Sequence, residues 1–152
     1  MKAERELNIS IVTALYNEEE SLRELLGWID ATLNKAQLKY EVILVDDGST
    51  DASWSVVSEL SLIYPIKAVR FRRNYGKSAA LYCGFEIATG EVVVTMDADL
   101  QDSPEEIPEL YTMIIDKGFD LVSGWKKKRF DDKLTKNIPS KIYNAAARRV
   151  TG

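Results

Sequence analysis

Short apolar runs alternate with segments of helical periodicity along the chain. The apolar runs predict five strands, at residues 8–15, 40–46, 66–71, 91–97 and 119–124. The periodic segments predict helices at residues 18–36, 51–64, 77–88, 103–118 and 138–151. Strands that are apolar throughout and separated by helices are typical of an α/β sandwich with a mainly parallel sheet.

The predicted helices have apolar faces and recognisable ends. The first helix places five apolar residues on one face: Leu22, Leu25, Leu26, Ile29 and Leu33. Thr50 or Asp51 is the expected N-cap of the second helix. The fourth helix begins with Ser103 as its cap and Pro104 at the first helical position.

Four of the predicted strands end in polar, loop-forming sequence. These ends read YNEE, DDGSTD, RRNYGK and DADLQD, and they begin at residues 16, 46, 72 and 97. Parallel strands have their carboxyl ends at the same edge of the sheet, and such sheets bind ligands beyond that edge. The sequence therefore predicts that a binding site lies where these four ends meet.

The fourth strand is followed by a cluster of oxygen-bearing side chains. Asp97 and Asp99 are two residues apart, which in a strand would point both carboxylates the same way, and Gln101 follows. Two converging carboxylates repel each other unless a cation lies between them, and oxygen ligands suit Mg²⁺ or Mn²⁺. The alternative is an acidic turn in which Asp102 and Ser103 cap the next helix.

Two other strand ends carry candidate ligands. Gly48 permits a tight turn after the second strand, and the neighbouring Ser and Thr suit a helix cap. The adjacent carboxylates Asp46 and Asp47 need a further explanation, and one of them could accept a hydrogen bond from a nucleobase N–H. After the first strand, Tyr16 and Glu18 are the better ligand candidates, because the acidic residues that follow are also typical of a helix N-terminus.

The composition limits the chemistry. The 152 residues fit one domain with ordinary proportions of hydrophobic (45%) and charged (29%) residues. The chain has no histidine, which excludes Ser-His-Asp and Cys-His catalysis and imidazole zinc sites. Cys83, as the single cysteine, favours a reducing cytosol. No apolar run is long enough for a membrane span, and the first ten residues lack the apolar core of a signal peptide.

The formal net charge of −4 is unevenly distributed. Residues 126–149 hold nine Lys and Arg but only two Asp, so the rest of the chain is strongly acidic. A basic stretch beside an acidic domain indicates an anionic partner, such as a phosphate, a lipid headgroup or a nucleic acid. A solvated helix face is the alternative.

Three competing motifs can be compared with the sequence. An EF-hand beginning at Asp97 fails, because Asp102 and Pro108 stand where that loop needs Gly and Glu. A P-loop ending at residue 78 also fails, because Phe71 stands where its first Gly is required. The acidic pair after the second strand is similar to that of a receiver domain of phosphotransfer signalling. In receivers the pair follows the first strand, yet this interpretation stays open.

Five motifs in order resemble family-2 glycosyltransferases with the GT-A fold. They read YNEEES, VDDGSTD, RNYGKSAAL, ATGEVVVTMDADLQDSPEEIP and DLVSGWKKKRFDD. The resemblance covers about residues 8–152 and is strongest to the branch of dolichyl-phosphate mannose synthase and the bacterial polyprenyl-phosphate glycosyltransferases. It implies a Rossmann-like three-layer sandwich forming a single domain over residues 1–152.

The resemblance also implies a set of site residues. Those of the nucleotide-sugar donor are Ala14, Tyr16, Glu18, Val45, Asp47, Lys77, Asp97, Ala98, Asp99 and Lys126. Asp97 and Asp99 would hold Mg²⁺ or Mn²⁺ with Gln101 as a further ligand, and would act in catalysis together with Lys126 and Arg129. Two of these positions depart from the common pattern of the family, which has Pro at Ala14 and Arg at Lys126.

The implied reaction transfers a sugar, with inversion, from a UDP- or GDP-sugar to a polyprenyl phosphate such as undecaprenyl or dolichyl phosphate. We favour UDP. Nucleic acid is not an expected partner, whereas a homo-oligomer is possible. An acceptor phosphate is already an anion and needs no strong general base. The basic stretch would hold it near the cytoplasmic face of a membrane.

Family members continue beyond residue 152, which predicts that this chain is the donor-binding part of a longer protein. The chain alone is then expected to be soluble and cytoplasmic. A nucleotide-sugar-binding module without catalytic activity is therefore the second hypothesis.

Overall fold

In a computed structural model, residues 7–124 of the chain are described. The chain divides into two compact units, residues 1–122 and residues 123–152, and the strands and helices below belong to the first. The helix predicted at residues 138–151 lies outside the described residues. That residues 1–152 form one domain stays a prediction.

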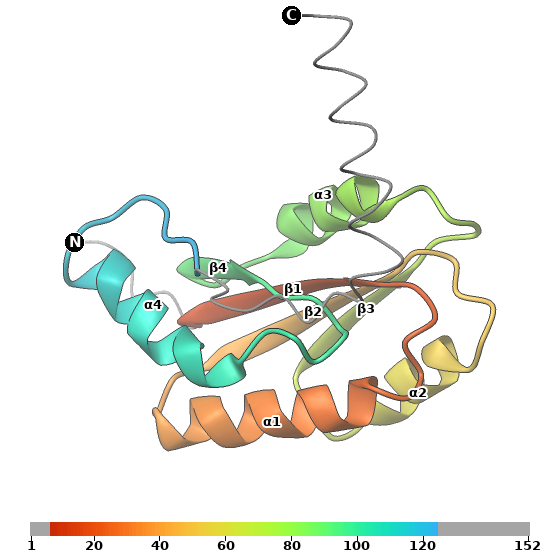
Figure 1. The fold of residues 1–152 in the computed structure, drawn as a ribbon, viewed down its shortest axis with the longest axis horizontal. Helices are drawn as coiled ribbons and strands as arrows, with labels where there is room; N and C mark the ends of the chain where they lie inside the picture. The colour runs from red at the N-terminus through yellow and green to blue at the C-terminus, as the bar shows by residue number, and fades with distance from the viewer. Residues whose placement is uncertain (1–6, 125–152) are drawn as a thin grey trace, which may run out of the picture. The chain divides into compact units, whose positions relative to one another are not determined.

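The first unit is built on a parallel sheet. Its strands are β1 (Ile9–Leu15), β2 (Tyr40–Asp46), β3 (Ile66–Arg70) and β4 (Val92–Thr95), in the order β3-β2-β1-β4. Each neighbouring pair is parallel, so all four carboxyl ends lie at one edge (Figure 1). The predicted α/β sandwich with a parallel sheet is confirmed.

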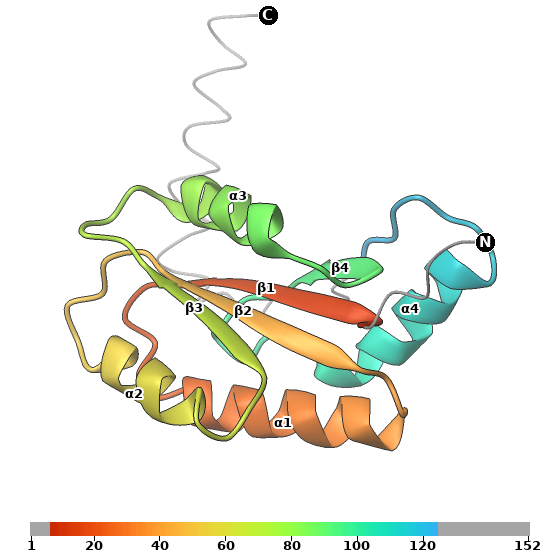
Figure 2. The same ribbon diagram turned by 180° about the vertical axis from the view of Figure 1, so that it is seen from behind.

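Helices cover both faces of the sheet. The helices α1 (Leu22–Lys35), α2 (Ser53–Leu60) and α4 (Ile107–Ile115) lie on one face, and α3 (Lys77–Ile87) lies on the other (Figures 1 and 2). A short 3₁₀ turn, η1 (Pro104–Glu106), precedes α4. Within the described residues, no helix is both long enough and apolar enough to cross a membrane.

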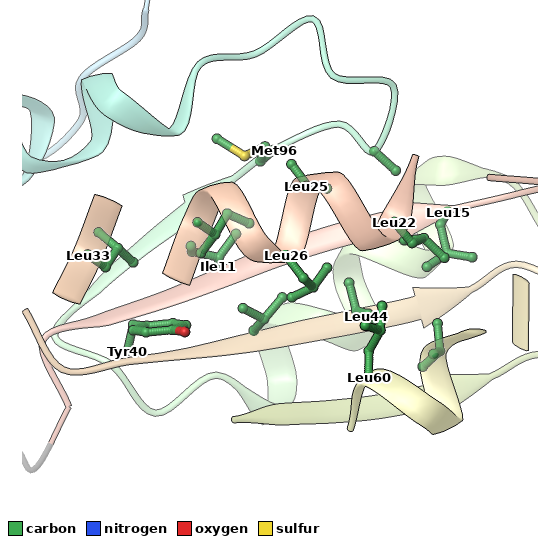
Figure 3. Packing of buried hydrophobic residues seen from close by; sticks show 14 of the residues in the cluster. Ile11, Leu15, Leu22, Leu25, Leu26, Leu33, Tyr40, Leu44, Leu60 and Met96 are labelled. Atoms are coloured by element: carbon green, nitrogen blue, oxygen red, sulfur yellow. The ribbon is translucent and has the colours of Figure 1, made fainter. Parts of the chain in front are cut away.

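The larger core lies between the sheet and α1. All five residues of the predicted apolar face of α1 are fully buried there, together with side chains of β1, β2, α2 and the segment after β4 (Figure 3). Each such Leu or Ile stabilises the fold by roughly 1.5–3 kcal/mol. A smaller core of Val12, Ile43, Val45 and Ala80 lies under α3.

A buried polar network holds the opposite, amino edge of the sheet. The Glu41 carboxylate accepts hydrogen bonds from Ser10 Oγ (2.6 Å) and Thr89 N (2.8 Å), and it pairs with Lys67 Nζ (2.6 Å). Burial raises the pKa of Glu41, but the hydrogen bonds from Lys67, Ser10 and Thr89 outweigh this and lower it to about 2. The carboxylate is therefore ionised at neutral pH.

The strand predicted at residues 119–124 is wrong. These residues form no strand, and the side chains of Phe119 and Leu121 are 51% and 85% exposed. An apolar run becomes a strand only when a neighbouring strand pairs with it, and the run alone does not specify that partner. Among the described residues, the other predicted elements differ from the structure at their ends only, most for α4, where η1 takes the first turn.

Candidate functional site

One pocket, of about 310 Å³, opens where the four strands end. Its walls come from the segments that follow β1, β2, β3 and β4. The lining residues are Ala14, Leu15, Tyr16, Glu18, Asp47, Asn74, Gly76, Lys77, Asp97, Ala98 and Asp99. The parallel sheet thus brings together four segments that are far apart in the sequence, at the edge where the sequence predicted a site.

Most of the predicted donor residues line this pocket: Ala14, Tyr16, Glu18, Asp47, Lys77, Asp97, Ala98 and Asp99. Val45 does not, because its side chain is fully buried in the core under α3. Gln101 is exposed and does not line the pocket; its backbone N–H donates to Asp99 Oδ1 (3.1 Å). Lys126 and Arg129 lie outside the described residues.

The loops after β1 and β2 are joined by reciprocal hydrogen bonds. Asn17 has a left-handed backbone, with φ of 56°, and its Oδ1 accepts a bond from Thr50 N (2.8 Å). In return, Asn17 N donates to Ser49 Oγ (3.0 Å) and Glu18 N donates to Ser53 Oγ (2.9 Å). These bonds fix the residues on either side of Asn17, which form one wall of the pocket.

The N-cap of α2 differs from the predicted one. The N-cap position is Ala52, one residue after Asp51 and two after Thr50, and Thr50 bonds to the loop after β1. Asp51 Oδ1 accepts a hydrogen bond from Ser53 N (2.9 Å), so it still satisfies an amide at the helix start. Burial raises the pKa of Asp51, but the bonds from Ser53 outweigh it and lower that pKa.

The two adjacent carboxylates after β2 have structural partners. Asp47 is 4% exposed, and its two oxygens accept bonds from Tyr75 N (2.7 Å) and Gly76 N (2.9 Å). Asp46 is fully buried; Oδ1 accepts from Ser49 N (2.8 Å), and Oδ2 lies 3.5 Å from Arg70 Nε. The sequence predicted only that one of them could accept a hydrogen bond from a nucleobase. It did not predict that both carboxylates hold the loops of the pocket in place.

Gly48 is required by a close approach as well as by its turn. Its φ is 75°, and a Cβ atom there would lie 2.4 Å from the carbonyl carbon of Arg73 and 2.7 Å from Asn74 N. The loop after β3 therefore packs directly against the turn after β2. The tight turn predicted at this glycine is confirmed, and the packing contact is an additional reason for it.

The segment after β4 differs from its prediction in one respect. Strand β4 ends at Thr95, so Asp97 and Asp99 lie on a loop rather than on the strand, yet both line the pocket. Asp102 Oδ2 accepts a bond from Asp97 N (3.0 Å), and Ser103 makes no side-chain cap bond. Asp102 therefore closes this loop.

A cation interacts with this acidic loop from across the pocket. Lys77 Nζ lies 2.5 Å from Asp97 Oδ1, and Lys77 is the first residue of α3. No group of three or more acidic or thiol side chains within residues 7–124 is placed to share a metal ion. Two carboxylates at one pocket nevertheless suit Mg²⁺ or Mn²⁺, which keep several waters and bind substrate phosphates directly.

Sequence reasoning missed three residues that line the pocket: Leu15, Asn74 and Gly76. The sequence contains a signal for Asn74 and Gly76, because both belong to the polar segment that follows the third predicted strand and is expected at the same edge of the sheet. Gly76 has a φ of 96°, and it turns the chain into α3. Asn74 belongs to the loop that packs against Gly48.

Comparison with solved structures gives the fold. The mannosyltransferase PcManGT from Pyrobaculum calidifontis, in complex with GDP-Man and Mn²⁺, matches 72% of this chain and 32% of its own, with a TM-score of 0.63 and 28% identity. S. aureus TarS 1–349, in complex with UDP, matches 86% of this chain and 40% of its own, with a TM-score of 0.64 and 23% identity. The expected GT-A fold is confirmed.

Sequence comparison gives the family. The chain is 47% identical over 146 residues to the undecaprenyl-phosphate 4-deoxy-4-formamido-L-arabinose transferase of Pseudomonas fluorescens strain Pf0-1, covering 95% of this chain and 42% of the relative. The enzyme of the same name from Pectobacterium atrosepticum strain SCRI 1043 is 43% identical over 147 residues, covering 95% and 44%. This chain thus spans about two fifths of the length of these relatives. The pattern of glycosyl transferase family 2 matches residues 10–151, and the chain belongs to that family.

Proposed function

We propose that this chain is the donor-binding part of a glycosyltransferase that moves a sugar from a nucleoside diphosphate to undecaprenyl phosphate. The observation that carries the proposal is the gathering of Glu18, Asp47, Asp97 and Asp99 around one pocket at the carboxyl edge of the sheet. The names of the curated relatives support the acceptor, and the family supports sugar transfer.

Each wall of the pocket has a proposed task. Tyr16, Glu18 and Asp47 lie on the side where the base and ribose of the donor would bind, and a UDP-sugar is favoured over a GDP-sugar. Asp97 and Asp99 would hold Mg²⁺ or Mn²⁺, which when bound neutralises the charge that develops on the departing diphosphate. Tyr16 lines the pocket and is 44% exposed, so its ring is accessible to a donor that binds there.

The acceptor side of the proposal depends on the basic stretch. Lys126 and Arg129 would hold the acceptor phosphate near the cytoplasmic face of a membrane, where anionic headgroups attract basic segments. The phosphate oxygen is already an anion, so it can attack the anomeric carbon and invert it without losing a proton to a base. This suits a chain that has no histidine.

A second hypothesis is that the chain binds the donor without completing the transfer. It is favoured by one observation, namely that the described pocket gathers most of the residues implied for the donor. The receiver-domain interpretation is wrong, because the chain belongs to glycosyl transferase family 2.

The test is a transfer assay with radiolabelled UDP- and GDP-sugars, undecaprenyl phosphate and Mn²⁺, run beside a calorimetric titration of each donor. We expect at least one donor to bind in the presence of Mn²⁺ and its sugar to reach the lipid. Binding without transfer would favour the second hypothesis. If neither UDP- nor GDP-sugars bind with the metal present, both hypotheses are wrong.

A further inference from the structure

We propose that Lys77 is an exchangeable counter-ion of the metal site. Its ammonium group balances Asp97 before a ligand binds, yields that carboxylate to the divalent cation, and then pairs with the diphosphate of the donor. This inference rests on the proposed function, because it requires a donor that carries a diphosphate.

The ion pair joins the two segments that would meet the metal and the phosphates. Lys77 begins α3, whereas Asp97 follows β4, and their side chains meet across the pocket at 2.5 Å. The contact uses Asp97 Oδ1, on one of the two carboxylates proposed for the metal. Because a divalent cation carries twice the charge of an ammonium group and approaches a carboxylate oxygen more closely, it would compete with Lys77 for that oxygen.

The charges of the pocket give the ammonium group a reason to stay there. Among the described residues that line the pocket, Lys77 is the one basic side chain, against the carboxylates of Glu18, Asp47, Asp97 and Asp99. Without a ligand, Lys77 reduces the repulsion between these carboxylates. With Asp97 holding a metal ion, the ammonium group of Lys77 would find a new anionic partner in a bound diphosphate in the same pocket.

The position of Lys77 allows this change of partner. Its side chain is 58% exposed and that of Asp97 is 40% exposed, so neither has to leave a packed core to move. Lysine carries a compact charge on a flexible four-carbon stem, and rotation about that stem re-aims the ammonium group. Its place in the first turn of α3 adds a favourable potential for an anion that binds there.

The experiment measures Mn²⁺ binding and nucleotide binding separately in the 152-residue chain. Mn²⁺ alone is titrated by electron paramagnetic resonance, and UDP, GDP and uridine are titrated by calorimetry in saturating Mn²⁺. We expect Lys77→Met to bind Mn²⁺ alone about 5-fold more tightly and the preferred nucleoside diphosphate about 10-fold more weakly, since one charge changes partner. Uridine, which has no phosphate, is expected to bind equally well to both proteins.

Lys35→Met is the matched control. It removes the same charge from an exposed side chain in the last turn of α1, at the opposite edge of the sheet, and it should change neither affinity. The inference is overturned if the wild type binds a nucleoside diphosphate but Lys77→Met changes neither the affinity for Mn²⁺ nor the affinity for that nucleotide by more than twofold. It is also overturned if Lys77→Met weakens Mn²⁺ binding. In both cases the proposed function stands. If the wild type binds neither Mn²⁺ nor a nucleoside diphosphate, the inference and the proposed function both fail.

Discussion

Replacing Asp99 with alanine is expected to weaken metal-dependent donor binding at least about 100-fold, which corresponds to about 2.7 kcal/mol. Asp99 lines the pocket, and Gln101 N fixes one of its oxygens. No group of three or more acidic or thiol side chains among the described residues is placed to share a metal ion, so Asp99→Ala would remove one of only two carboxylates proposed for it. Calorimetric titration of UDP and GDP with and without Mn²⁺ measures the effect.

A matched control is Asp120→Ala, which removes an exposed carboxylate on the loop after α4 that does not line the pocket. It should leave donor binding unchanged. An Asp99→Ala protein that keeps its Mn²⁺-dependent affinity within threefold would show that the metal is held elsewhere. The assignment of Asp97 and Asp99 to the metal would then be wrong, although the fold and the family would stand.

The second large effect is expected at the turn after β2, where Gly48→Ala should lower the free energy of unfolding by about 3 kcal/mol. Two costs combine there. The φ of 75° disfavours any residue with a Cβ atom, and that atom would lie 2.4 Å from the backbone of Arg73. Backbone cannot rotate away as a side chain can, so the loop after β3 must shift. Urea denaturation followed by circular dichroism measures the change.

Gly118→Ala separates the two costs. Gly118 has a φ of 71° but nothing lies within 4 Å of an added Cβ, so alanine there meets the strained backbone alone, which costs about 1 kcal/mol. The loop shift in Gly48→Ala should also weaken donor binding, because Asn74 and Gly76 line the pocket. Equal destabilisation by the two substitutions would show that the contact with Arg73 does not constrain the turn.

The parts of the fold that the sequence predicted are those encoded locally. Periodicity identified the buried face of α1 correctly, because core contacts select every third or fourth residue of a helix. The parallel sheet followed from apolar strands separated by helices, and it placed the polar strand ends at one edge. The strand predicted at residues 119–124 was wrong because local apolarity does not specify a pairing partner.

The parts that the sequence could not predict are long-range polar contacts. Asn17 meets Thr50, and Asp47 meets Gly76, across about thirty intervening positions. No periodicity connects such residues, since each pair meets only because two parallel strands end side by side. The same limit applies to Lys77, which the family resemblance assigned to the donor without indicating that it pairs with Asp97.

The most direct measurement is anomalous diffraction at the manganese edge from crystals grown with Mn²⁺ and the nucleoside diphosphate that binds. We predict one strong peak in the pocket, from a manganese ion bonded to carboxylate oxygens of Asp97 and Asp99 and to phosphate oxygens of the nucleotide. A nucleotide bound in the pocket with manganese on other residues, or with no manganese at all, would contradict it.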